Sequence, residues 1–198
     1  MAHAHHHSQG FDPHRLLDRE PNRRRLIDPE RIMKEALQAG DRQMADVGCG
    51  VGFYALAAAP LISPGTVRAV DVHPDMVRTT LERARESGMD NVQGVVCDAM
   101  QLPLETGSID LVFMGTVLHD FAKPVQALAE ARRVLGPNGR LYLVEWSKTA
   151  IEDGPPDEVR FSEEALQQLL LAAHFQPEWV KSGPGPFYRV LAWLTDGE

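Results

Sequence analysis

The sequence is poor in cysteine, in long apolar stretches and in positive charge, and each shortage excludes a class of protein. Two cysteines, Cys49 and Cys97, are too few for a disulfide framework, so a reduced, cytoplasmic setting is the expectation. The longest apolar run, residues 54–62, contains Pro60 and is far too short to cross a bilayer. No N-terminal segment combines positive charge with an apolar run, which argues against export. The net charge of -8 gives no general attraction to nucleic acid or anionic lipid, so neither nucleic-acid binding nor stable membrane insertion is expected.

What the sequence does contain fits one globular domain. Its 198 residues, 43% hydrophobic and 24% charged, have the length and composition of a single folded unit. Residues 1–10 include four histidines and almost nothing apolar, which predicts a disordered His-rich tail. Residues 11–25 carry Pro13, Pro21 and many arginines, so we expect an irregular N-terminal arm before a domain spanning residues 26–198.

From Asp28 onward, helical and strand patterns alternate. Strands are expected at residues 44–47, 66–71, 92–97, 109–114 and 140–146, with helices starting after Asp28 and covering residues 54–59, 74–87, 125–135 and 162–174. This alternation implies an α/β fold of three αβα layers around a mostly parallel sheet. The last two strands, at 176–181 and 187–194, are joined by only five residues, so they have to pair as an antiparallel hairpin. The expected sheet therefore has seven strands.

A glycine-rich segment, DVGCGVG at residues 46–52, lies between the first strand and its helix. Glycine lets a ligand approach the backbone closely, and the following helix N-terminus offers free N–H groups. Dinucleotide folds use the spacing G-x-G-x-x-G, whereas here the third glycine comes one residue early and an aspartate precedes the first glycine by two positions. The pattern disfavours a pyrophosphate and suits a ligand with a carboxylate and an ammonium, such as an amino-acid tail. A plain packing turn is the alternative.

Acidic residues follow the next two strands. Asp71 ends the second strand, 19 residues after Gly52, where a carboxylate can accept hydrogen bonds from both ribose hydroxyls. Asp98 follows the third strand and can accept from an adenine amino group. Each aspartate alone also fits a solvated loop. Their joint position at the carboxyl ends of successive strands favours a nucleoside site, because open α/β sheets bind ligands at that edge.

With the stretches IDLVFMGTVLHD and RVLGPNGRLYLVEW, these motifs resemble those of class I S-adenosylmethionine-dependent methyltransferases, nearest to the methyltransferase type 11 group that includes ubiquinone/menaquinone C-methyltransferases. The resemblance covers about residues 26–194 and implies a Rossmann-like sheet in the order 3-2-1-4-5-7-6. It also implies S-adenosylmethionine as cofactor, S-adenosylhomocysteine as product and a small-molecule methyl acceptor. The cofactor-binding residues that it implies are Asp46, Gly48, Gly50 and Gly52 for the methionyl part, Asp71 for the ribose, Val72, Asp98 and Ala99 for the adenine, and the backbone around Met114 and Gly115 for the methionyl amine.

Two further residues are candidates for catalysis at the same edge. His119 follows the fourth strand, and its imidazole can take a proton from an acceptor near neutral pH, with Asp120 orienting the ring. Glu145 closes the fifth strand, where a carboxylate can bind a polar acceptor or offset the sulfonium charge. A structural role is the alternative for both residues.

Several conspicuous features are expected to carry no chemistry. No metal site is predicted, because the terminal histidines are interrupted by alanine and no third cysteine completes a thiolate site. Arg23, Arg24 and Arg25 are expected to form a solvated or acid-pairing face.

The arm at residues 11–25 is expected to act as a lid, since the resemblance places the helix that follows it beside the active edge.

The expected function is therefore methyl transfer to a small or medium-sized acceptor by in-line displacement. Two alternatives stay open. One is a protein that binds S-adenosylmethionine or S-adenosylhomocysteine without catalysis, because alignment chemistry requires no obligatory catalytic residue. The other is a nicotinamide-dependent oxidoreductase, which the glycine spacing and the terminal hairpin disfavour.

Overall fold

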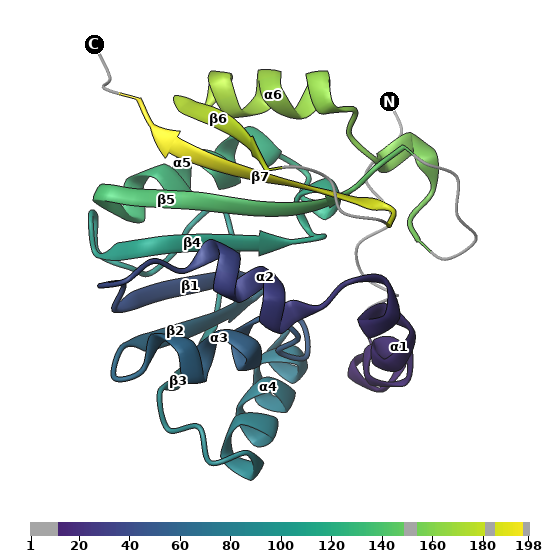
Figure 1. Ribbon diagram of the computed structural model, residues 1–198, viewed down its shortest axis with the longest axis vertical. Coiled ribbons are helices and arrows are strands. Elements are labelled where there is room, and N and C mark those ends of the chain that lie inside the picture. The colour runs from purple at the N-terminus through teal and green to yellow at the C-terminus, as the bar shows by residue number, and fades with distance from the viewer. Residues whose placement is uncertain (1–11, 149–153, 181–184, 196–198) are drawn as a thin grey trace.

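A seven-stranded sheet forms the centre of the computed structural model, which describes residues 12–148, 154–180 and 185–195 (Figure 1). The strands are β1 (Gln43–Val47), β2 (Thr66–Asp71), β3 (Val92–Val96), β4 (Ile109–Gly115), β5 (Leu135–Trp146), β6 (Phe175–Val180) and β7 (Phe187–Leu194). Their order is β3-β2-β1-β4-β5-β7-β6. Strands β1 to β5 pair in parallel, and β7 runs antiparallel to both β5 and β6. The predicted α/β fold, strand order and closing hairpin are confirmed.

Helices cover both faces of the sheet (Figure 1). Helices α2 (Pro29–Ala36), α3 (Ala55–Ile62) and α4 (Pro74–Glu86) lie on one face, and α5 (Pro124–Val134) and α6 (Glu163–Ala172) lie on the other. Two short 3-10 helices, η1 (Leu118–Asp120) and η2 (Asp157–Val159), follow β4 and β5 in the chain. Each face of the sheet has its own core of buried aliphatic and aromatic side chains, so the sheet is a rigid support for the loops at its edges.

Local capping explains where two of the helices begin. The Asp28 carboxylate accepts a hydrogen bond from the backbone N–H of Arg31 at 3.1 Å, and Pro29 occupies the first turn of α2. The Ser162 hydroxyl accepts one from the N–H of Ala165 at 3.2 Å at the start of α6. Both helix starts agree with the sequence prediction.

The irregular arm predicted for residues 11–25 is wrong, because Pro13–Leu26 form a helix, α1. Asp12 caps it by accepting from the N–H of His14 at 2.9 Å, and Pro13 sits in the first turn, where its missing donor has no cost. Pro21 lies inside the helix, at a position that usually costs about 3 kcal/mol. No residue of α1 is fully buried, so contacts with the rest of the protein have to hold this helix in place. Figure 1 shows α1 outside the sheet layers, near the edge to which β4 points.

The predicted His-rich tail, residues 1–10, lies outside the described residues. In the three described ranges, every helix is too short or too polar to pass through a bilayer.

Candidate active site

The structure brings the predicted site residues to one edge of the sheet, at the carboxyl ends of β1 to β5. By strand, they are Asp46, Gly48, Gly50 and Gly52 at β1, Asp71 and Val72 at β2, Asp98 and Ala99 after β3, Met114, Gly115 and His119 at β4, and Glu145 at β5. This placement follows from the parallel pairing, because parallel strands direct their carboxyl ends to the same side.

The glycine loop after β1 turns tightly over the strand end. Gly48, Gly50 and Gly52 have φ values of +78°, +53° and +86°, in the left-handed region that favours glycine. The requirement is strongest at Gly48, where a β-carbon would lie 2.4 Å from Cγ2 of Val117. The loop therefore depends on glycine both for its conformation and for its packing against the segment after β4.

Asp71 supports this loop from the end of β2. One carboxylate oxygen accepts from the N–H of Gly50 at 3.0 Å, and the other accepts from the N–H of His73 at 3.0 Å. Each carboxylate oxygen has two lone pairs, so both retain capacity for a ligand hydroxyl. Val72, the next residue, is 56% exposed, which leaves an apolar side chain at the surface beside this carboxylate.

The residues after β3 and β4 differ in what they can present to a ligand. Asp98 is exposed, and one of its carboxylate oxygens accepts from the N–H of Met100 at 2.9 Å. Ala99 and Met114 are buried in the core of the α5 and α6 face, so their backbones rather than their side chains are available. The expectation that Met114 and Gly115 act through the backbone is consistent with this burial.

The Asp46 carboxylate is buried, and its hydrogen bonds satisfy it only in part. The side chain is almost fully buried, and no residue of the described chain forms a hydrogen bond with its Oδ2 atom. Burial raises the pKa of Asp46 to about 7, and the charge of Asp71 adds to the increase. A hydrogen bond from the backbone of Ala55 and the positive charge of Arg23 oppose the shift. This oxygen is suited to receive a cationic or hydrogen-bond-donating ligand.

Asp46→Asn is expected to stabilise the ligand-free protein, and to do so clearly more at pH 8 than at pH 5. Between the unfolded pKa near 3.8 and the folded pKa of about 7, the folded state holds a proton that the unfolded state has released. Stability therefore falls as the pH rises through this window, and asparagine avoids the loss, a gain of roughly 1–4 kcal/mol at pH 8. Thermal denaturation at both pH values measures it, with the exposed Asp90→Asn as control. An identical change in melting temperature at the two pH values would contradict the assignment.

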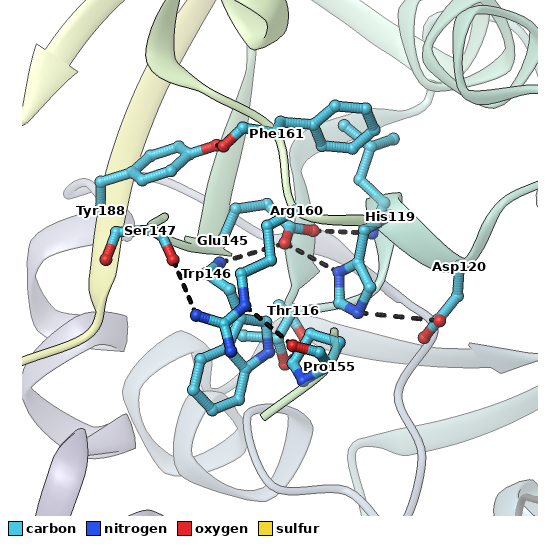
Figure 2. Close-up of polar contacts among 12 residues, drawn as sticks. Thr116, His119, Asp120, Glu145, Trp146, Ser147, Pro155, Arg160, Phe161 and Tyr188 are labelled. Carbon is cyan, nitrogen blue, oxygen red and sulfur yellow. Dashed lines mark hydrogen bonds and ion pairs between the residues drawn. The ribbon is translucent and has the colours of Figure 1, made fainter. Parts of the chain in front are cut away.

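His119 and Glu145 form a buried pair between the ends of β4 and β5 (Figure 2). Their side chains are 4% and 1% exposed, and His119 Nδ1 lies 2.9 Å from Glu145 Oε2. Glu145 also accepts from the backbone N–H of Leu118 at 2.8 Å and from that of Trp146 at 3.2 Å. A carboxylate acceptor at Nδ1 favours the tautomer with the proton on that atom, which leaves the lone pair of the neutral ring on Nε2.

The environment of His119 favours its protonated form. Burial alone lowers the pKa of His119, but the hydrogen bond and charge of Glu145, together with the charge of Asp120, outweigh it and raise the pKa above 6.5. Asp120 Oδ1 lies 3.7 Å from Nε2, too far for a hydrogen bond. Glu145 rather than Asp120 therefore orients the ring.

A second group of residues at this edge was not predicted from the sequence. Arg23 of α1 donates a hydrogen bond from Nη2 to the Thr116 hydroxyl at 2.8 Å, and its guanidinium carbon lies 4.3 Å from the ring centroid of Phe53. Thr116 has a φ of +56°, which is unusual for a residue with a branched β-carbon. Of the three consecutive arginines, Arg24 pairs with Glu20 and Glu30 as expected, whereas Arg23 turns into the site. Helical spacing from Leu16 was the signal that would have placed Arg23 on an inward face.

In the described part of the chain, neither the acidic residues nor the cysteines form a metal centre. Among residues 12–148, 154–180 and 185–195, no three His, Cys, Asp or Glu side chains lie together in a way that could hold a metal ion. Burial raises the pKa of Cys49 well above that of a free thiol, so its sulfur stays protonated and packs as a small core group.

Comparison with known proteins agrees with the fold. Residues 45–143 match a family model described as a methyltransferase domain. The chain is similar to the crystal structure of a SAM-dependent methyltransferase from Aquifex aeolicus, with 30% identity and a TM-score of 0.82 over 92% of this chain and 98% of that one. It is also similar to the cyclase SpnF, with 30% identity and a TM-score of 0.67 over 76% of this chain and 58% of that one.

A curated relative gives a similar result over part of its length. The chain is 32% identical over 123 residues to the demethylmenaquinone methyltransferase of Staphylococcus aureus strain JH9, across 62% of this chain. The chain spans half the length of this relative and of its counterparts from other strains.

Proposed function

The chain belongs to the class I S-adenosylmethionine-dependent methyltransferases, and on that premise we propose that it transfers a methyl group to a small or medium-sized acceptor, with His119 as general base. S-adenosylmethionine supplies a methyl group on a positively charged sulfur, so the electrophile is already activated. The protein's part is to align the reactants, to exclude water and to remove a proton from an acceptor that carries one.

The residues at the sheet edge fit this cofactor. The buried, unpartnered Oδ2 of Asp46 suits the ammonium of an amino-acid tail, since a buried carboxylate is stabilised by an opposite charge. We assign the methionyl part to Asp46, to the backbone of the glycine loop and to the backbone around Gly115. The free lone pairs of Asp71 suit the ribose hydroxyls, and the exposed Val72 suits one face of the adenine. Asp98 and the backbone of Ala99 lie at the next strand end, where we place the adenine edge.

The buried pair of His119 and Glu145 is assigned to the proton. Glu145 holds the ring by its Nδ1 atom, and Nε2 then accepts the acceptor's proton as the methyl group moves. The resulting imidazolium is stabilised by the carboxylates on either side, Glu145 and Asp120. We regard Glu145 as a positioning residue, because its oxygens are directed to His119 and to two backbone amides rather than to an acceptor.

One observation carries the proposal. A cofactor-type site at the ends of β1 to β3 and a buried base at the ends of β4 and β5 share one edge of a single sheet. We expect micromolar affinity for S-adenosylmethionine and S-adenosylhomocysteine, near -8 kcal/mol by calorimetry. Transfer of a tritiated methyl group to a panel of phenols, thiols, amines and a demethylated naphthoquinol then tests the reaction. The naphthoquinol is included because the curated relative is named for such an acceptor.

The same measurements separate the alternatives. A protein that only binds the cofactor would respond in calorimetry but transfer no label to any member of the panel. We test for this outcome because one structural neighbour is named as a cyclase and not as a methyltransferase. A nicotinamide-dependent oxidoreductase would bind NAD and ignore both sulfur ligands, an outcome that the family membership and the reversed β7 strand disfavour.

A further inference from the structure

Helix α1 lies across the glycine loop and contacts it through one face. Leu16, Glu20 and Arg23 are separated by four and three residues, which places their side chains on the same side of the helix. Cδ1 of Leu16 is 3.5 Å from the position that a β-carbon on Gly50 would take. The first of these three residues therefore lies directly over the loop.

An arginine from α4 joins α1 to the loop. Arg83 forms an ion pair with Glu20 at 2.9 Å and donates to the backbone carbonyl of Val51 at 2.6 Å. Because the Val51 carbonyl belongs to the glycine loop, the second residue of the α1 face is also tied to the cofactor site.

Arg23, the third residue of this face, reaches furthest into the site. Its guanidinium carbon lies 4.3 Å from the ring centroid of Phe53 and 5.2 Å from that of Tyr54, distances at which a cation is attracted by an aromatic face. Its Nη2 donates to the Thr116 hydroxyl, which in turn donates to the carbonyl of Gly115 at 2.7 Å. The guanidinium is thus one hydroxyl away from a carbonyl at the end of β4.

The surroundings of this guanidinium are negative. The Gly115 carbonyl ends β4, and the positive charge of Arg23 favours the ionised form of the buried Asp46 at the end of β1. The methionyl ammonium assigned to Asp46 and Gly115 above would bring a second cation into the same small region. Two cations in one buried region repel each other, because the surroundings screen their charges only weakly.

We propose that α1 is a lid on the cofactor site and that Arg23 is its latch. The guanidinium, one hydroxyl away from the Gly115 carbonyl assigned to the cofactor's ammonium, leaves Thr116 before the cofactor binds or the product departs. This inference rests on the proposed function, which assigns the methionyl position. The helix is suited to such movement, since it buries no residue fully and Pro21 interrupts its hydrogen bonding.

Stopped-flow binding of S-adenosylhomocysteine to Arg23→Gln tests the latch. We expect the association rate constant to rise about five- to 20-fold, because a larger fraction of the ligand-free protein has the lid open. Amide hydrogen exchange over residues 13–26 should be faster in the ligand-free variant. Arg25→Gln is the matched control, because it removes the same charge from an exposed position on the same helix and should change neither measurement.

A change on the opposite side of the contact gives an independent test. Thr116→Ala removes the hydroxyl that Arg23 contacts and should also raise the association rate, whereas Thr116→Ser should behave like the wild type. If Arg23→Gln leaves the association rate unchanged and raises only the dissociation rate, Arg23 is a ligand contact and the latch is wrong. If neither the wild type nor the variant binds S-adenosylhomocysteine, the proposed function fails and the latch fails with it.

Discussion

Removing the Asp71 carboxylate is expected to weaken S-adenosylhomocysteine binding by roughly 10- to 100-fold, since two ribose hydroxyls would lose their acceptor. The carboxylate also accepts from the amides of Gly50 and His73, so Asp71→Ala loosens the loop that the ligand contacts. Calorimetry gives the dissociation constants, and thermal denaturation shows whether the variant is folded. Asp75→Ala, an exposed acid in the first turn of α4, is the control and should bind like the wild type.

An analogue of the ligand separates the ribose contact from the effect on the loop. S-adenosylhomocysteine without its 2′-hydroxyl should bind the wild type more weakly than the parent compound. Asp71→Ala should distinguish the two compounds much less, because it lacks the carboxylate that would accept a hydrogen bond from the 2′-hydroxyl. Equal discrimination by both proteins would remove Asp71 from the ribose site.

His119→Ala is expected to lower turnover about 100-fold with the acceptor identified in the transfer panel, while cofactor affinity stays the same. A base acts in its unprotonated form, and the pKa of His119 is raised by Glu145 and Asp120 against the effect of burial. Turnover of the wild type should therefore increase with pH through an apparent pKa above 6.5. The residual activity of the variant should not show this increase with pH. Equal turnover of the variant and the wild type from pH 6 to pH 9 would assign His119 a structural role.

Glu145→Gln tests the positioning of the ring. Glutamine offers one acceptor oxygen in place of two, so it cannot accept from Leu118 on one side and from both His119 Nδ1 and Trp146 on the other. The variant also lacks the charge that stabilises the His119 imidazolium, so turnover should fall roughly tenfold or more without a change in cofactor affinity. A turnover equal to that of the wild type would show that Glu145 does not hold the ring for catalysis.

Much of the fold was predictable because its determinants are local. Alternating helical and strand periodicities specified five parallel-type strands, and the caps at Asp28 and Ser162 marked two helix starts. The five-residue connection after residue 181 is too short for a crossover helix, so the last two strands had to be antiparallel. The glycine spacing and the aspartates at successive strand ends likewise indicated the site edge from sequence positions alone.

Helix α1 was mispredicted because its stability is not local. Pro21 removes an internal hydrogen bond, and propensity therefore argues against a helix. Contacts made far along the chain, with Arg83 and Thr116, compensate for this loss. Arg23 was grouped with its exposed neighbours because its partner, Thr116, lies far along the chain.

The sequence by itself determined the order of elements, the glycine loop and the acidic residues at the cofactor edge, since each depends on residues close together in the chain. Only the tertiary structure decided which charges meet. His119 pairs with Glu145, 26 residues away, rather than with the adjacent Asp120, and burial rather than residue type raises the pKa of Asp46 to about 7. Pairing and desolvation depend on distances and enclosure in three dimensions, which spacing along the chain does not specify.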